Sequence, residues 1–196
     1  KHRNSDSLAS LVFPQRDVNL SSIFAGYGIS NATSFPESIS LERGISLYGE
    51  AAFYPQSWVT LYDDFSKRKE TAEFYSVEAQ AEFFIPFFLD HHVPYLAANA
   101  RWTSGKNPEV YRVRLSSYMR GLIPEASPYG RGAIVLTAEY RFPLLWLSRR
   151  LILWWPSLGL RYISLAPFYD YGQSFEREVY RDTWNRSYGI YTDIGL

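Results

Sequence analysis

Residues that commonly carry out catalysis are scarce in this chain. Its 196 residues include no cysteine and three histidines, which excludes a cysteine nucleophile, a disulfide framework and a thiolate metal site. His91 and His92 are adjacent in a short predicted turn, with only Asp90 beside them as a further metal ligand, and no Gly-x-Ser-x-Gly motif supplies a serine nucleophile. We therefore expect a protein that is not an enzyme and that holds no metal ion or cofactor.

The spacing of the charged residues suits the polar wall of a lumen rather than acid–base catalysis. Glu78 and Glu82 fall on one face of a predicted strand, about 13 Å apart by strand rise, which is farther than paired glycosidase carboxylates lie. Gly105-Lys106 lacks the rest of a phosphate-binding loop. The 20 basic and 20 acidic residues give a net charge of zero, so no basic surface is expected to bind nucleic acid.

Aromatic residues make up 18% of the chain, although its mean hydropathy is only −0.23. Large rings in a chain that is polar on average need a specific environment. One such environment is the core of a soluble β-sandwich; the other is a transmembrane β-barrel with an apolar outer face, a polar lumen and aromatic rims. Charged residues are costly on the core face of a sandwich but not in a lumen, which favours the barrel.

No transmembrane helix is predicted. The most apolar region, Pro143 to Tyr169, is interrupted by Arg149, Arg150, Pro156 and Arg161. The first residues of the chain are charged and polar, unlike those of a signal peptide, so we expect the chain to begin as a mature protein or within a longer one.

Apolar and polar residues alternate with a period of two in segments of about ten residues, the length that a tilted strand needs to cross a bilayer. Between Tyr75 and Ile85 the odd-numbered residues are apolar, and the even-numbered ones include Glu78 and Glu82. The predicted strands are Val18 to Ser30, Leu41 to Tyr54, Tyr75 to Ile85, Tyr95 to Thr103, Gly132 to Phe142, Tyr162 to Gly172 and Arg186 to Leu196. The sequence thus predicts an all-β protein, with about seven strands of an antiparallel transmembrane β-barrel.

The predicted connections alternate in length, as they do at the two ends of an antiparallel barrel. Asn31 to Ile39 and Pro86 to His92 are short, whereas Pro55 to Glu70, Ser104 to Arg131 and Gln173 to Asn185 are longer and more polar. Pro143 to Leu160 is the exception. It falls on the short-turn side but is long, and its tryptophans and arginines suit a membrane interface, so we expect an interfacial hairpin extension that is partly helical.

Four short motifs follow one another in the second half of the chain. They are Met119-Arg120-Gly121-Leu122 in the longest loop, the Gly-rich strand start Tyr129-Gly130-Arg131-Gly132, Glu139-x-x-Phe142-Pro143 at the end of that strand, and Phe168-x-Asp170-x-Gly172 in the next strand. In this order they resemble the barrel of the Omp85 superfamily. That family includes outer-membrane protein insertases of the BamA type, related translocation and assembly proteins, and two-partner secretion transporters.

The resemblance implies a role for the long loop. Segment 104–131 would fold into the barrel lumen, where Arg120 and Gly121 would anchor it to Glu139 and Asp170 on the wall. The strand alternation independently places both carboxylates on the polar face, and a guanidinium can hold a carboxylate through two hydrogen bonds. Without the resemblance, Arg120 would be interpreted as a solvated loop charge.

Two features depart from the family pattern. Leu122 stands where the family usually has an aromatic residue, which weakens the stacking expected in the lumen, and the chain ends in Leu196 rather than in an aromatic residue. The family barrel has roughly sixteen strands. Residues 1–196 are therefore expected to form part of one barrel domain, mainly its C-terminal half, with the periplasmic domains outside this chain.

The function implied by the resemblance is the insertion, assembly or translocation of proteins at the bacterial outer membrane, without a cofactor. Its partners would be the lipid bilayer, substrate outer-membrane or secreted proteins, and periplasmic proteins or lipoproteins. A passive porin-like or structural barrel, whose loop only narrows the pore, is the alternative. A soluble β-sandwich that acts as a binding module is a third hypothesis.

Overall fold

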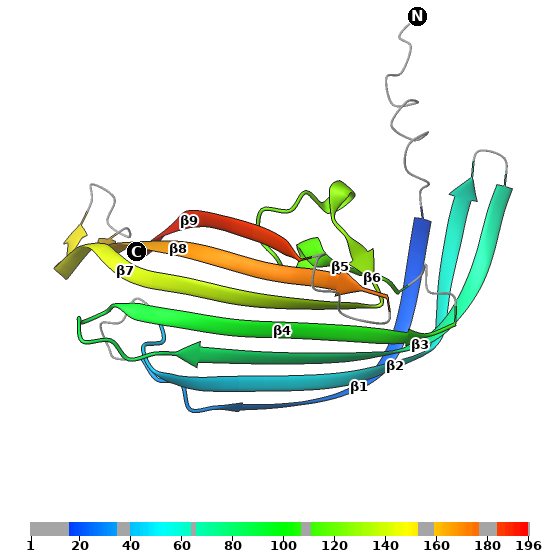
Figure 1. Ribbon diagram of the computed structural model, residues 1–196, viewed down its shortest axis with the longest axis horizontal. Helices are drawn as coiled ribbons and strands as arrows, with labels where there is room; N and C mark the ends of the chain where they lie inside the picture. The colour runs from blue at the N-terminus through cyan, green and yellow to red at the C-terminus, as the bar shows by residue number, and fades with distance from the viewer. Residues whose placement is uncertain are drawn as a thin grey trace, which may run out of the picture.

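The computed structural model describes residues 16–34, 40–63, 66–106, 111–152, 159–176 and 184–195. These residues form one antiparallel sheet of seven strands in chain order (Figure 1). The strands are β1 (Arg16–Ser30), β2 (Gly44–Asp63), β3 (Ser66–Phe84), β4 (Val93–Gly105), β7 (Gly132–Ile152), β8 (Gly159–Phe175) and β9 (Asn185–Gly195). The predictions of an all-β chain and of antiparallel pairing are confirmed. Within the described residues β1 and β9 do not pair with each other, so the sheet is open.

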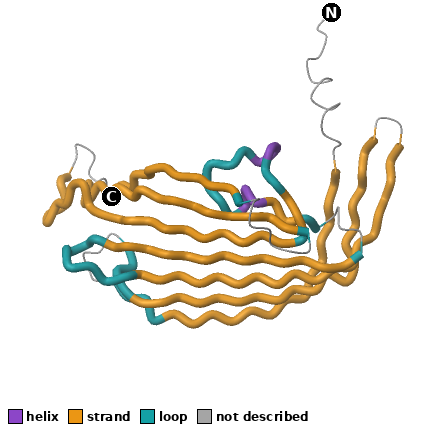
Figure 2. Tube along the Cα trace, in the orientation of Figure 1, coloured by secondary structure: helices purple, strands orange, loops and turns teal. Residues whose placement is uncertain are grey.

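The connection between β4 and β7 has structure of its own. It contains β5 (Val113–Arg114), the 3-10 turns η3 (Leu115–Ser117) and η4 (Pro124–Ala126), and β6 (Tyr129–Gly130). β5 and β6 pair with each other as a small ribbon. Figure 2 shows this segment gathered near one end of the long sheet. We call residues 111–131 the anchored loop.

One side of the sheet is free of charge across its central part. The pairing register aligns Ala81 with Ala98, and Leu96 with Ala138, so that the apolar residues of successive strands share one side. Every second residue of each strand falls on this side. Counted in steps of two from the first residue given, they are 23–29 of β1, 45–53 of β2, 75–83 of β3, 96–102 of β4, 134–142 of β7, 163–171 of β8 and 188–194 of β9. None of them is charged; Arg186, which pairs with Tyr171 near the start of β9, is a charged residue in register on this side just beyond them. We call this side the apolar face.

Many large side chains of the apolar face are exposed, including Tyr27 at 74% and Ile190 at 69%. The opposite side, which we call the polar face, carries charged residues on six of the seven strands. They are Glu50, Glu78, Glu82, Arg101, Glu139, Arg141, Asp170 and Asp193. The fold thus separates one apolar side from one charged side, as the period-two alternation predicts.

The expected loop from Pro55 to Glu70 is wrong. β2 continues to Asp63 and β3 begins at Ser66, so most of this segment is paired strand. A register shift lies between Tyr54 and Ser57, and Figure 1 shows the two strands bending away from the sheet near this end. The polarity of the segment suggested a loop, but its run of aromatic and β-branched residues supports a strand.

The segment Pro143 to Leu160 is an extension of the β7–β8 hairpin, but it contains no helix in its described part. β7 runs to Ile152 and β8 begins at Gly159, with register shifts after Pro143 and Trp146. The expectation of partly helical structure is therefore wrong for residues 143–152 and 159–160. Residues 153–158 and Leu196 lie outside the described residues. No described helix has the length and hydropathy needed to span a membrane.

The anchored loop packs on the polar face through a small apolar cluster. Leu115 and Met119 from the loop pack with Ala133 and Val135 of β7, and all four are buried. Leu115 has no exposed surface. Burying these groups removes apolar surface from water and so holds the loop against the polar face of the seven-stranded sheet, which we call the wall.

We predict that Leu115→Ala loosens this loop by roughly 2 to 5 kcal/mol, because it leaves a cavity under the loop. Hydrogen exchange of the loop amides measures the effect in the full-length protein. The control is Ile123→Ala in the same loop, where the side chain is 67% exposed and its loss should have little effect. Equal exchange in both variants would contradict the packing.

Candidate functional site: the anchored loop

Arg120 is positioned by a tight turn of the anchored loop. The backbone N–H groups of Tyr118 and Met119 both donate to the carbonyl of Leu115, at 3.0 Å. Because Leu115 and Met119 are buried against the wall, this turn is held close to the polar face. The next side chain, Arg120, therefore reaches the strand residues beneath the loop.

Arg120 and Asp170 form a two-pronged ion pair. The Nε of Arg120 donates to Oδ2 of Asp170 at 2.9 Å, and its Nη2 donates to Oδ1 at 2.8 Å. The backbone N–H of Arg120 also donates to Oδ2, at 3.2 Å, and Thr137 donates to Oδ1 at 2.9 Å. The side chain of Asp170 is only 1% exposed. A carboxylate buried to this degree needs such a set of donors.

Glu139 lies on the other side of the same guanidinium. Nη1 of Arg120 donates to Oε2 of Glu139 at 2.9 Å. The other oxygen, Oε1, accepts from Nε of Arg141 at 2.5 Å and from the hydroxyl of Tyr191. Loop residue Arg120 thus joins carboxylates of β7 and β8 in one network, to which β9 contributes a hydroxyl.

The ring of Phe168 lies under the guanidinium of Arg120, whose Cζ is 3.7 Å from the ring centroid. Phe168 pairs with Gly189 of the neighbouring strand. A Cβ at position 189 would come within 2.9 Å of this ring, so the glycine leaves room for it. The stacking therefore comes from the wall, while Leu122 packs against the apolar cluster of the loop.

The charge on Arg120 is strongly stabilised. Burial disfavours the charged form, but the hydrogen bonds to Asp170 and Glu139 outweigh it and raise the pKa of the guanidinium above its ordinary value. Arg120 is therefore a permanent cation at the polar face.

Gly121 has a backbone conformation and a setting that suit only glycine. Its φ is +76°, in the left-handed region. A Cβ at this position would lie 2.7 Å from Oγ of Ser187 on β9. The Arg-Gly pair thus combines a long cation with a residue that lets the backbone come close to the wall.

The remaining motif residues surround the ion-pair network or lie beyond it. Gly132 begins β7 where a Cβ would meet the ring of Phe175 at 2.4 Å, and Gly172 faces Val135, whose Cγ2 would be 2.9 Å from such an atom. Phe142 lies on the apolar face, and Pro143 lies next to a register shift of β7.

A second contact between loop and wall was not predicted from the sequence. Arg101 of β4 donates from Nη1 to the hydroxyl of Tyr118 at 3.1 Å and from Nε to Ser76 at 3.1 Å, and it lies 3.4 Å from Glu78. Burial raises the pKa of Tyr118, although the hydrogen bond from Arg101 acts in the other direction. The alternation of β3 and β4 placed Arg101 and Glu78 on one face, but no pattern identified the loop tyrosine as their partner.

His91 and His92 are structural rather than freely exposed turn residues. Nδ1 of His91 lies 2.8 Å from Glu42, and Nδ1 of His92 lies 2.7 Å from the hydroxyl of Tyr140. Both side chains are partly buried. No cluster of potential metal ligands occurs among the described residues.

No family model, curated protein or solved structure matches this chain. The geometry of the site points to its role. That geometry joins a long loop to a strand wall through a buried ion-pair network, and it suits mechanical fixation of the loop.

We predict that Arg120→Lys detaches the loop despite keeping the charge. Lysine cannot bridge Asp170 and Glu139 with a planar fork, and a buried carboxylate that loses its partner costs about 3 kcal/mol. Limited proteolysis of the full-length protein should cleave within 111–131 faster than in the wild type. Arg114→Lys, on an exposed side chain of the same loop, is the control; equal cleavage of the two variants would contradict the role of Arg120.

Gly121→Ala should also weaken loop docking, by roughly 1 to 3 kcal/mol, because alanine is strained at this φ and its Cβ approaches Ser187 too closely. The double variant Gly121→Ala, Ser187→Gly removes the steric conflict but not the backbone strain. Hydrogen exchange of the loop should therefore be partly restored in the double variant. No effect of the single variant would show that the loop does not lie against β9.

Proposed function

We propose that this chain forms part of the wall of an outer-membrane β-barrel of the Omp85 type, which inserts or translocates proteins at the bacterial outer membrane. The observation that carries the proposal is the combination of an uncharged apolar face with an opposite face on which a long loop is held by Arg120, Glu139 and Asp170. The motifs that contain these residues are the ones that resemble the family.

Lipid is the environment that suits the apolar face. A contiguous set of exposed large apolar side chains over seven strands exceeds what a soluble monomer normally shows to water. On β7 the uncharged alternation runs from Ile134 to Phe142, which is nine residues and close to the length of a membrane-crossing strand. A lipid-facing outer side and a polar lumen side follow from this distribution.

The proposed mechanism is mechanical. In the lumen, the anchored loop would brace β7, β8 and β9 through Arg120, and so stiffen one part of the barrel wall. Substrate strands would then be added by backbone pairing at a weaker seam elsewhere in the barrel. Substrate outer-membrane or secreted proteins would be the partners, with periplasmic proteins or lipoproteins delivering them.

A passive porin-like barrel is the second candidate. The observation that favours it is the double fixation of the loop, by Arg120 and by the contact between Arg101 and Tyr118, because a static constriction needs such fixation. The two functions differ in the consequence of releasing the loop. Arg120→Lys should impair assembly of other barrel proteins if the first proposal holds, whereas it should change only ion conductance in a porin.

We predict opposite labelling of neighbouring positions in the full-length protein in lipid. Single cysteines at Ala79 and Ala81 should react only with lipid-soluble probes, while cysteines at Glu78 and Glu82 should react with water-soluble ones, because the two pairs lie on opposite faces of β3. The described chain supplies no competing cysteine. Labelling of all four positions from water would exclude membrane insertion and favour a soluble sandwich.

A further inference from the structure

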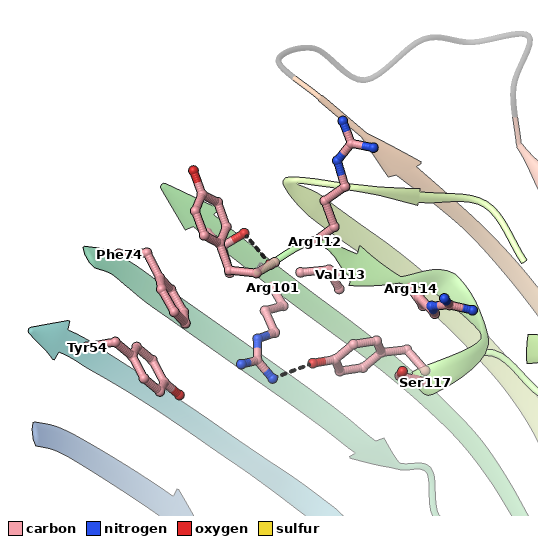
Figure 3. A pocket seen from close by; sticks show the side chains of 10 residues that line it. Tyr54, Phe74, Arg101, Arg112, Val113, Arg114 and Ser117 are labelled. Atoms are coloured by element: carbon pink, nitrogen blue, oxygen red, sulfur yellow. Dashed lines mark hydrogen bonds between the residues drawn. The ribbon is translucent and has the colours of Figure 1, made fainter. Parts of the chain in front are cut away.

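A cavity of about 290 Å³ lies between the anchored loop and the wall, apart from the Arg120 network (Figure 3). Figure 3 shows Tyr54 and Phe74 along one side of it, Arg101 beside them, and Ser117 and Arg114 on the side of the loop. The volume is near the lower end for ligand pockets, which is about 300 Å³, and it suits a single ring with one substituent.

The aromatic side of the cavity is a stack of three rings. Tyr54 and Phe74 are 4.2 Å apart with an interplanar angle of 10°, and Phe74 and Tyr111 are 4.8 Å apart at 24°. Phe74 and Tyr111 are buried, whereas Tyr54 is half-buried at the end of the stack. The rigid stack therefore offers the cavity an apolar surface against which a ligand ring could pack.

The charged residues that line the cavity are all arginines. Arg101 uses Nε for Ser76 and Nη1 for Tyr118, with Glu78 3.4 Å from Nη1, and its Nη2 has no hydrogen-bond partner among the described residues. Arg114 uses Nη1 for the carbonyl of Pro124. A guanidinium with donors still available favours an anionic group, such as a phosphate or a carboxylate.

Hydroxyl groups complete the lining. In the described part of the chain, the hydroxyls of Tyr54 and Ser117 make no hydrogen bond, while that of Thr103 is engaged by the carbonyls of Tyr111 and Arg131. The cavity thus combines one apolar plane, three arginines and two available hydroxyls. Of ligands with an anionic group, a polyol ring uses all three features, whereas an aromatic carboxylate would leave the hydroxyls unused.

We propose that this cavity binds an anionic sugar unit, meaning one sugar ring that carries a phosphate or a carboxylate. The ring packs on Tyr54, its anionic group binds Arg101, and its hydroxyls meet Ser117 and the phenol of Tyr54. The proposal goes beyond the barrel function, and it requires only that the loop lies on the polar face. The sugar can be a soluble one or the headgroup of a glycolipid.

Calorimetry with glucose 6-phosphate tests the proposal on the full-length protein in detergent micelles. Glucose 6-phosphate should bind at least 10-fold more tightly than glucose or inorganic phosphate. Arg101→Gln should weaken binding at least 10-fold. Because Arg101 also holds Tyr118, a second variant, Ser117→Phe, fills the cavity without removing a hydrogen bond, and it should abolish binding. Arg131→Gln, whose side chain does not line the cavity, should bind as the wild type does.

The source of the sugar is resolved in nanodiscs with and without a glycolipid whose headgroup is a phosphorylated glucosamine. If the glycolipid headgroup occupies the cavity, it competes with glucose 6-phosphate, which should then bind more weakly in discs with the glycolipid than in discs without it. Equal binding in the two kinds of disc would assign the cavity to a soluble sugar. Equal affinity for phosphate and glucose 6-phosphate, or wild-type affinity in Ser117→Phe, would overturn the proposal. Sugar binding in micelles does not depend on insertion into a membrane. A negative binding result can therefore be distinguished from a failure of the labelling prediction for β3.

Discussion

The ion pair between Arg120 and Asp170 is the contact on which the arrangement of loop and wall depends. Asp170 is almost fully buried on the polar face, and the side chains that bond its carboxylate are Arg120 and Thr137. A buried carboxylate without a cation would either take up a proton and become neutral or destabilise the wall. Since Arg141 of the neighbouring strand is committed to Glu139, the cation comes from the loop.

Several features of the fold prepare the wall for this contact. Gly189 leaves space for Phe168, which supplies the ring beneath the guanidinium, and Gly121 lets the loop backbone approach β9. Leu115 and Met119 contribute the apolar part of the docking. The ion-pair network thus lies beside an apolar contact that excludes water, and together they fix both the position and the orientation of the loop. This combination explains how a long connection becomes an ordered part of the wall.

The strand faces were predictable from the sequence, because alternation with a period of two leaves little choice of register when one face is apolar. The contact of Arg120 with Glu139 and Asp170 was expected from the motifs, since long-range pairing of a loop residue leaves no local periodicity to detect. The extension of β2 through residues 55–63 and of β3 from residue 66 was missed because polar residues near the end of a hairpin resemble a loop, although backbone pairing continues. The contact of Arg101 with Tyr118 was missed for a related reason: the wall residue was placed correctly, but nothing local indicates where a loop tyrosine ends up.

The anchored loop lies against β9, and a disulfide tests this position most directly. A Cβ built at Gly121 lies 3.8 Å from Cβ of Ser187, the usual separation across a disulfide. The pair Gly121→Cys, Ser187→Cys in the full-length protein in native membranes should therefore cross-link under mild oxidation, while Ile123→Cys with Ser187→Cys should not. Two free, reactive thiols in the first pair after oxidation, while the loop amides of the Gly121→Cys single variant stay as protected from hydrogen exchange as in the wild type, would contradict this position of the loop.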